Sequence, residues 1–218
     1  MKNNLRQVYN EVGKHYTKPR LLWPEVKEWL EEVSKHDLVL DVGCGEGRLL
    51  QELGSKADYT GIDFSPKLID MAKRRYKGRK TRFITGDVCQ KETWNDLKKY
   101  DKIFLVAMLH HLPTRKLQLY VLKKVRQHMK TGGKVFVSCW DLFRKKFLGE
   151  HLRNLRLKLS HLPESIRWVE IPFGGTKIKR FYVAGGEKYW KDLCLEAGWE
   201  QEKIQLKRTK KNILMVLG

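Results

Sequence analysis

The chain has 218 residues, 41% of them apolar and seven of them tryptophan, which suffices for one packed domain and argues against an intrinsically disordered protein. Its 45 Lys and Arg residues outnumber its 25 Asp and Glu residues, so the formal net charge is +20. A positive field of this size favours polyanionic partners, nucleic acid above all. A generally basic proteome or a simple need for solubility would explain the same excess.

The apolar runs and the cysteines indicate where the protein works. The longest uninterrupted apolar run, Ile103 to Leu109, is too short to span a bilayer, and no charged leader precedes an apolar stretch near Met1. Four cysteines are scattered without a C-x-x-C pair, at Cys44, Cys89, Cys139 and Cys194. We expect reduced thiols, no metal site of the protein's own, no membrane contact and a cytoplasmic location.

In chain order, the first clear element is a helix after Pro24. It places Val26, Trp29, Leu30 and Val33 on one side, which predicts that it packs on a sheet. Apolar strands then alternate with amphipathic helices, a pattern typical of α/β proteins. The strands are expected at Leu38 to Gly43, Tyr59 to Asp63, Arg82 to Asp87, Lys102 to Leu109 and Lys134 to Trp140.

Three helices are expected between these strands. The first covers about Glu46 to Leu53, and the second begins after the N-cap Ser65 and runs to about Tyr76. The third is capped by Thr114 and ends at Gly132-Gly133. Five β-units in succession predict a doubly wound, mostly parallel sheet whose ligands bind at the carboxyl ends of the strands.

The pattern breaks between Asp141 and Gly186. Leucines at 148, 152, 155, 159 and 162 predict one apolar face of a helix that stops at Pro163, and a polar, glycine-rich stretch follows. A helix from Glu187 to about Ala197 and strands near Trp199 to Leu206 and Asn212 to Leu217 close the chain. We expect a single domain, 1–218, divided into an N-terminal cover and helix (1–36), a cofactor-binding core (37–140), a basic substrate-recognition insertion (141–186) and C-terminal elements (187–218).

The stretch "LDVGCGEG" carries glycines at 43, 45 and 47, so the third glycine comes one residue too early for a dinucleotide-binding loop. Asp41 precedes this loop, where a carboxylate suits an ammonium group better than a pyrophosphate. Asp63 and Asp87 end the next two strands, where they would suit a ribose diol and an adenine amino group. S-adenosylmethionine therefore fits better than NAD. The alternative is a glycine turn that only packs a helix on a strand.

On these residues, 37–140 resemble the core of class I S-adenosylmethionine-dependent methyltransferases. Asp41 and the three glycines match the first motif, and Asp63 and Asp87 match the acids after the second and third strands. The resemblance implies a Rossmann-like, seven-stranded sheet with an insertion after the fifth strand. Residues expected to bind the cofactor are Tyr16, Arg20, Trp23, Asp41, Gly43, Cys44, Gly45, Gly47, Asp63, Phe64, Asp87, Val88 and Ala107.

Three further stretches are similar to the tRNA wobble-uridine carboxymethyl methyltransferase family. They are "HYTKPRLLWPEVKEWL", "AMLHHLPTRKLQLYVLKKVRQHMKTGGKVFVSCW" and "KRFYVAGGEKYWKDL". The resemblance implies an enzyme that acts on the tRNA anticodon region and esterifies 5-carboxymethyluridine. It also implies a small zinc-binding activator protein as a partner.

This chemistry needs no general base, because a carboxylate is already ionised at neutral pH. We expect Arg180 to clamp the acceptor, with Arg20 second, and Tyr182 to donate a hydrogen bond. His110 and His111 are expected at the mouth of the site, one in the nucleobase pocket, and either one could instead be a structural histidine. Tyr16, Thr17, Arg20 and Trp23 are expected to cover the methyl donor. The alternative is an N-terminal helix that only caps the core.

The insertion supports an RNA partner. Lys and Arg exceed acids there, and aromatic side chains lie between the cations, as suits unpaired bases. The alternative is a solvated face over a leucine-rich helix. Two other functions stay open, a methyltransferase for small metabolite carboxylates or quinone precursors, and a non-catalytic RNA-binding module.

Overall fold

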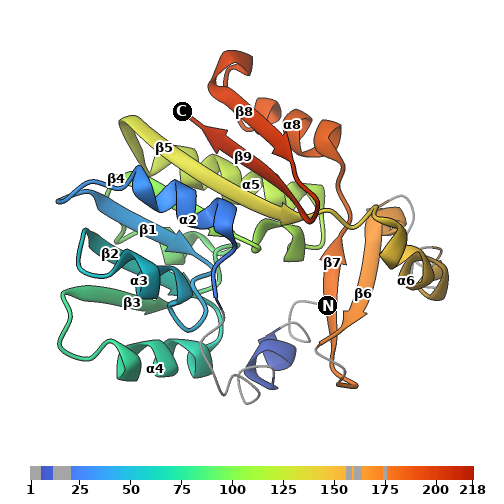
Figure 1. Ribbon diagram of the computed structural model, residues 1–218, viewed down its shortest axis with the longest axis horizontal. Coiled ribbons are helices and arrows are strands. Elements are labelled where there is room, and N and C mark those ends of the chain that lie inside the picture. The colour runs from blue at the N-terminus through green and yellow to red at the C-terminus, as the bar shows by residue number, and fades with distance from the viewer. Residues whose placement is uncertain (1–5, 12–20, 156–158, 160–163, 174–175) are drawn as a thin grey trace.

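The protein is built around one twisted, seven-stranded sheet (Figure 1). The computed structural model describes residues 6–11, 21–155, 159, 164–173 and 176–218. The strand order is β3-β2-β1-β4-β5-β9-β8, parallel except at β9, which is antiparallel to both neighbours. The strands are β1 (Leu38–Val42), β2 (Asp58–Asp63), β3 (Thr81–Thr85), β4 (Tyr100–Val106), β5 (Met129–Trp140), β8 (Ile204–Arg208) and β9 (Asn212–Leu217). The predicted doubly wound, mostly parallel α/β sheet is confirmed.

Helices cover both faces of this sheet and form two apolar cores. Helices α2 (Pro24–Glu31), α3 (Arg48–Leu53) and α4 (Pro66–Arg75) contribute to the core on one face. Helices α5 (Arg115–Gln127) and α8 (Glu187–Glu196) contribute to the core on the other face. The predicted packing of α2 on the sheet is confirmed, because Trp29 lies 5.4 Å from the ring of Phe136 in β5. Within the described residues no helix is long and apolar enough to cross a membrane.

The capping residues predict the starts of α4 and α5 correctly, whereas the glycine pair after α5 predicts the end of that helix wrongly. Ser65 and Thr114 both cap, since their side chains accept hydrogen bonds from Leu68 N and Leu117 N. The expectation that Gly132-Gly133 ends α5 was wrong. The helix ends at Gln127, where the ring of His128 bonds to the carbonyl of Lys124, and both glycines belong to β5.

The insertion contains a second, two-stranded sheet that the sequence did not indicate. Strands β6 (Trp168–Pro172) and β7 (Lys179–Val183) pair antiparallel and stand beside the carboxyl edge of the main sheet (Figure 1). The indole of Trp168 donates to Pro113 O at 2.8 Å and so ties the hairpin to the loop after β4. Short 3-10 turns are η1 (Lys91–Trp94), η2 (Leu109–His111), η3 (Lys145–Phe147), η4 (Glu164–Arg167) and η5 (Gln201–Lys203). The strand expected from Trp199 begins later, at Ile204, because η5 precedes it.

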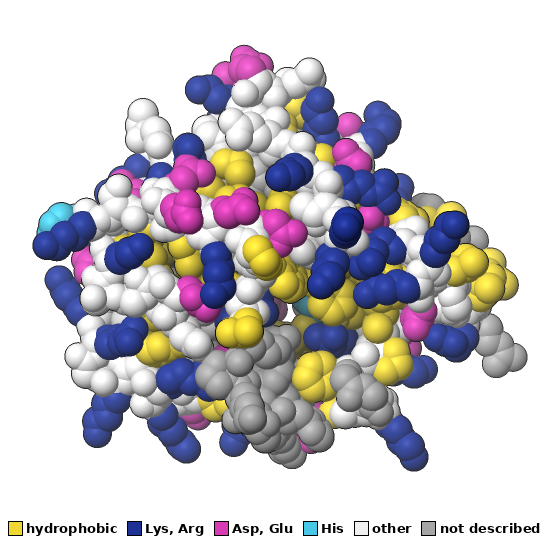
Figure 2. Space-filling model, in the orientation of Figure 1, with side chains coloured by type: hydrophobic (Ala, Val, Ile, Leu, Met, Phe, Trp, Pro, Cys, Tyr) yellow, Lys and Arg dark blue, Asp and Glu magenta, His cyan; other side chains and the backbone are white. Residues whose placement is uncertain are grey.

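The leucine-rich stretch is helical at Leu155 and Leu159 as well as in its first turns, and its described leucines point outward. Helix α6 covers Leu148–Arg153, and the described leucines of the predicted face are 54–66% exposed. Leu162 lies outside the described residues. Figure 2 shows this apolar surface at the edge of the molecule, bordered by Lys and Arg side chains. Its leucines therefore add little to the core.

Candidate active site

Two adjoining cavities open at the carboxyl ends of β1, β2 and β4. The larger has a volume of about 370 Å³ and the smaller about 90 Å³. Residues that line both are Tyr9, Gly43, Asp63, Ala107 and His111. The topology predicted a ligand at this edge, and the cavities lie there.

The glycine loop after β1 forms the floor between the cavities. Gly43 has a φ of 80°, and a Cβ there would overlap the side chain of Met108, so only glycine fits. Gly47 has a φ of 82° and is fixed from behind, because Tyr76 donates its hydroxyl to Gly47 O at 2.7 Å. Cys44 and Gly45 line the smaller cavity.

Asp63, at the end of β2, connects the glycine loop to α4. Its Oδ2 accepts from Gly45 N and its Oδ1 from Ser65 N, both at 2.9 Å. Burial raises the pKa of this carboxyl to about 6, although both backbone donors oppose the shift. Each carboxylate oxygen keeps a further lone pair, so the side chain can also accept from a ligand's hydroxyl groups.

Asp41 is placed differently from the expectation. It is buried behind the glycine loop, lines neither cavity, and accepts a hydrogen bond of 2.7 Å from Tyr59. Burial raises its pKa to about 7, opposed by the Tyr59 hydrogen bond and by Arg48. Its direct contact with a ligand stays a prediction, and the structure gives it a supporting position under the loop.

The far wall of the larger cavity is formed by the ends of β2, β3 and β4. Phe64, Asp87, Val88 and Ala107 all line it, in the region where the sequence placed an adenine-binding group. Asp87 accepts a hydrogen bond of 2.9 Å from Cys89 N, which fixes its carboxylate. Ala107 has a φ of 55°, a conformation unusual for alanine, at the turn that leaves β4 for the site.

The N-terminal segment reaches the site with residues that the sequence did not single out. Residues 6–11 are helical and lie between the main sheet and the hairpin (Figure 1). Tyr9 lines both cavities, and Asn10 accepts a hydrogen bond of 2.6 Å from Ser65. Trp23 lines the smaller cavity, and its role in a cover over the methyl donor stays a prediction. Tyr16, Thr17 and Arg20 lie outside the described residues, so their roles stay predictions.

Arg180 and Tyr182 on β7 form the opposite wall of the smaller cavity. Arg180 is only 7% exposed, and its guanidinium carbon lies 4.8–5.5 Å from the rings of Phe173, Trp140 and Tyr182. No carboxylate among the described residues pairs with it, and its Nε has no hydrogen-bond partner there. A buried cation without a counter-ion favours an anionic ligand.

The two histidines are fixed by hydrogen bonds. His111 Nδ1 lies 2.8 Å from Phe181 O, and its Nε2 lies 2.8 Å from the hydroxyl of Tyr9, so the ring joins the hairpin to the N-terminal helix. His110 is fully buried, and its Nδ1 accepts from Trp140 N at 3.3 Å. Burial, His111 and Arg180 lower the pKa of His110 well below its ordinary value. His110 is therefore neutral at physiological pH.

The cavities suit a cationic adenosine-bearing ligand. The larger cavity has apolar walls for a base and acidic groups for a ribose, and Glu46 lines the smaller one. Glu46, missed at the sequence level, is 2% exposed. Its oxygens accept no hydrogen bond from the residues that the structure describes, and it lies 3.9 Å from Arg75. The signal in the sequence that could have identified Glu46 is its position inside the glycine loop, in the stretch "GCGEG". In the described part of the chain no group of three His, Cys, Asp or Glu residues could hold a metal ion.

With this geometry in view, comparison with known proteins identifies the class. Residues 39–133 match a family described as a methyltransferase domain. Together with the seven-stranded sheet and its loop, this defines a class I S-adenosylmethionine-dependent methyltransferase. The expected cofactor, S-adenosylmethionine, is confirmed at the level of this class.

Within the class, the chain is similar to tRNA methyltransferases. It is 29% identical over 141 residues to the tRNA (carboxymethyluridine(34)-5-O)-methyltransferase of Saccharomyces cerevisiae, covering 63% of this chain and 48% of that protein. It is 24% identical over 157 residues to the mouse tRNA (carboxymethyluridine(34)-5-O)-methyltransferase ALKBH8, covering 71% and 23%. The chain thus spans less than half the length of these relatives.

Solved structures share the fold. A methyltransferase from Methanosarcina mazei superposes with a TM-score of 0.70 at 19% identity, covering 91% of this chain and 97% of that one. The structure titled DhpI-SAM-HEP complex superposes with a TM-score of 0.71 at 18% identity, covering 99% and 96%. At these identities the likeness establishes the fold alone.

Proposed function

We propose that this protein transfers a methyl group from S-adenosylmethionine to the carboxylate of a modified uridine in tRNA, forming the methyl ester of 5-carboxymethyluridine at the wobble position. The observation that carries the proposal is Arg180, a buried cation at the smaller cavity that no carboxylate of the described residues pairs with. The similarity to tRNA carboxymethyluridine methyltransferases supports the choice of acceptor.

Residues on the β1–β4 side would hold the methyl donor. The glycine loop and Asp63 border both cavities, so the donor would extend from the larger cavity into the smaller one. Asp63 would accept from the ribose hydroxyls and Asp87 from the adenine amino group, while Glu46 suits the ammonium group. When bound, S-adenosylmethionine supplies an electrophilic methyl group on a sulfonium.

Residues on the hairpin side would position the acceptor. Arg180 would bind one carboxylate oxygen by a charge-assisted hydrogen bond and leave the other oxygen free to attack. Tyr182, fully buried and close to both histidines, would fix the approach of the acceptor. The rings of Trp23, Trp140 and Tyr182 line this cavity and would keep water from the bound carboxylate, which would make it a better nucleophile than it is in solution.

No residue needs to act as a general base in this scheme. The acceptor carboxylate loses its charge on esterification and releases no proton, because it is already ionised. The buried, neutral His110 suits such a reaction, since its lowered pKa leaves it uncharged throughout. His111 would position Tyr9 and β7 rather than move a proton.

The experiment that tests the proposal is nucleoside mass spectrometry. The purified protein would be incubated with labelled S-adenosylmethionine and tRNA that carries 5-carboxymethyluridine, and the tRNA then digested to nucleosides. We expect labelled methyl ester at that uridine and its loss on mild alkaline hydrolysis. A second sample would include the small zinc-binding activator that the resemblance implies, which stays a prediction.

Two results would contradict the proposal. Label on another nucleoside would exclude the carboxymethyl acceptor. Label on a small carboxylic acid in the absence of RNA, together with none on tRNA, would favour a metabolite methyltransferase. Arg180→Met serves as the matched negative control, since it removes the guanidinium but keeps an apolar side chain within the ring cluster.

A further inference from the structure

A third pocket lies beside the candidate acceptor cavity and has no role in the proposed reaction. It has a volume of about 120 Å³, and its walls include Trp23 and Trp140, which also line the smaller cavity. The two sites therefore share two indole rings. Whatever binds in this pocket lies next to the acceptor.

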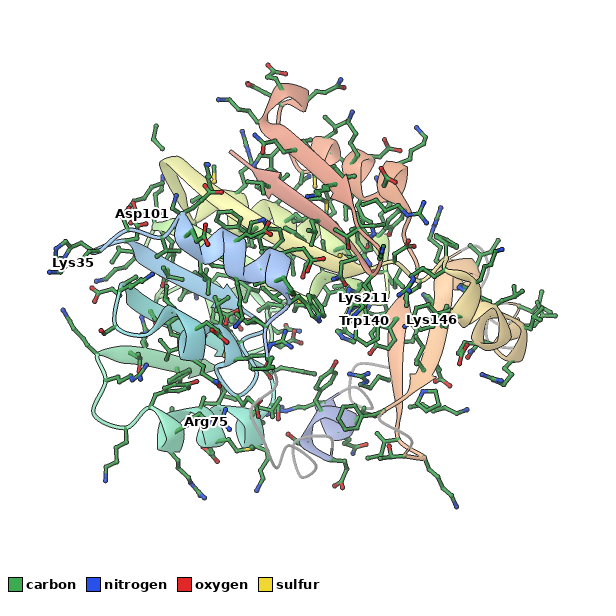
Figure 3. All side chains as sticks on the ribbon, viewed as in Figure 1. Lys35, Arg75, Asp101, Trp140, Lys146 and Lys211 are labelled. Carbon is green, nitrogen blue, oxygen red and sulfur yellow. The ribbon has the colours of Figure 1, made fainter. Side chains whose placement is uncertain are left out.

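Three cations surround this pocket. Arg144, Lys146 and Lys211 all line it, from the loop after β5 and from the turn before β9. Figure 3 shows Trp140, Lys146 and Lys211 close together in projection, and in Figure 2 Lys and Arg side chains gather at the same place over apolar surface. The pocket thus combines aromatic walls with a concentrated positive charge.

The cations have no acid of their own. None of the three forms an ion pair with a carboxylate of the described residues. The nearby acids are otherwise engaged, since Asp141 binds Arg208 at 2.8 Å and Glu150 binds Arg153 at 2.9 Å. Burial, Arg144 and Lys211 lower the pKa of Lys146, and the charge of Glu150 opposes this shift only in part. An anion in the pocket would relieve this repulsion.

A fourth polar group in the same pocket also lacks a partner. Asn212 lies opposite Trp140 in the β5–β9 register and lines the pocket. It is 2% exposed, and its Nδ2 has no hydrogen-bond partner among the described residues. A buried amide donor without an acceptor is uncommon in folded proteins and points to a ligand oxygen.

We infer that this pocket binds the nucleotide adjacent to the acceptor uridine in single-stranded RNA, with its base against the shared indoles and its phosphate among Arg144, Lys146 and Lys211. Base stacking on aromatic rings next to backbone cations is how proteins hold unpaired nucleotides. The inference rests on the proposed function, because it takes the acceptor to be RNA. It adds a second nucleotide subsite to that function.

The test is a binding measurement that does not depend on methyl transfer. Fluorescence anisotropy would follow a labelled oligouridylate of seven nucleotides, without any carboxymethyl group, at several salt concentrations. We expect the double variant Lys146→Gln/Lys211→Gln to bind about tenfold more weakly than wild type. The slope of log affinity against log salt should shrink by about 0.7 for each phosphate that the variant no longer neutralises.

A matched control separates the pocket from net charge. Lys35→Gln/Lys56→Gln removes the same charge from exposed residues at the opposite end of the sheet, and Figure 3 shows Lys35 far from Lys146. We expect this control to bind like wild type. Calorimetry with S-adenosylmethionine should give wild-type affinity for both double variants, which verifies that they fold.

Competition separates a nucleotide site from a simple anion site. At equal ionic strength, uridine 5′-monophosphate should displace the oligonucleotide at lower concentration than inorganic phosphate does. Equal competition would overturn the stacking half of the inference. Equal losses of affinity in the pocket and control variants, or no RNA binding by wild type, would overturn it entirely.

The outcomes also separate this inference from the proposed function. If wild type forms no ester but the pocket variant alone loses RNA affinity, the proposed function fails and the pocket stands as a binding site for a nucleotide of single-stranded RNA. If the pocket variant esterifies tRNA with wild-type kcat/KM, the subsite fails and the proposed function stands.

Discussion

Replacing Arg180 by methionine should separate function from stability. The guanidinium is buried among three rings, and no carboxylate in the described part of the chain pairs with it, so in the free protein its charge is desolvated and poorly compensated. Methionine has a similar length and fits among rings. We therefore expect the Arg180→Met protein to fold and to lose activity.

The sizes of the effects on activity and on stability follow from the interactions that Arg180 makes. A hydrogen bond to a charged group contributes about 1.5–3 kcal/mol, so losing the one from Arg180 to the acceptor should lower kcat/KM about 10- to 150-fold. For stability, the variant loses cation–π attraction of about 0.5–2 kcal/mol and gains relief from a buried charge of similar size. Its free energy of unfolding should stay within about 1 kcal/mol of wild type.

The assay combines methyl transfer to 5-carboxymethyluridine tRNA with urea unfolding in the absence of ligands. Arg167→Met is the matched control, because Arg167 also lies over a ring, Tyr189 at 4.6 Å, but lines neither cavity. We expect the control to keep wild-type kcat/KM. Unchanged activity in Arg180→Met, or a loss of more than about 2 kcal/mol in unfolding free energy, would refute the reasoning.

Three further variants test the donor side. Asp63→Asn should weaken S-adenosylmethionine binding about 10- to 100-fold by calorimetry, with Asp58→Asn on the exposed start of β2 as the unaffected control. Gly43→Ala should abolish measurable binding, because its Cβ overlaps Met108, and should lower the melting temperature. Asp41 has a folded pKa of about 7 against an ordinary 3.8, so its contribution to stability is present below about pH 4 and is lost as pH rises towards 7. Asp41→Asn should therefore become more stable relative to wild type as the pH rises, and the difference between their unfolding free energies should grow by about 2–4 kcal/mol between pH 4 and pH 8. A constant difference would show that Asp41 is ionised throughout.

The main sheet was predictable because its signals are local. Each parallel strand is a short apolar run between turns, and Ser65 and Thr114 sit where helix caps are expected. The hairpin was not predictable in the same way. Phe181, Tyr182 and Val183 are consecutive in β7 and all buried, so the alternation that indicates a half-exposed strand is absent.

The site was predictable only in part, since sequence spacing gives the strand end but not the direction of a side chain. Asp41 and Asp63 lie at the ends of neighbouring strands, and the sequence predicts that both contact the cofactor, yet Asp63 lines the cavities and Asp41 lies behind the loop. Tyr9 precedes β1 by some thirty residues without a periodic pattern. Its hydrogen bond to His111, 102 residues away, exists only in the folded chain.

The two histidines bear on which acceptor suits this site. An enzyme that methylates a neutral hydroxyl needs a base close to the reacting oxygen, with a pKa near the working pH. Here His110 is buried with a strongly lowered pKa, and both ring nitrogens of His111 already lie at hydrogen-bond distance from Phe181 O and Tyr9. His110 is therefore uncharged, and the ring of His111 is held between the hairpin and the N-terminal helix. The cation Arg180 faces the same cavity, so the arrangement favours an acceptor that arrives with its negative charge already formed.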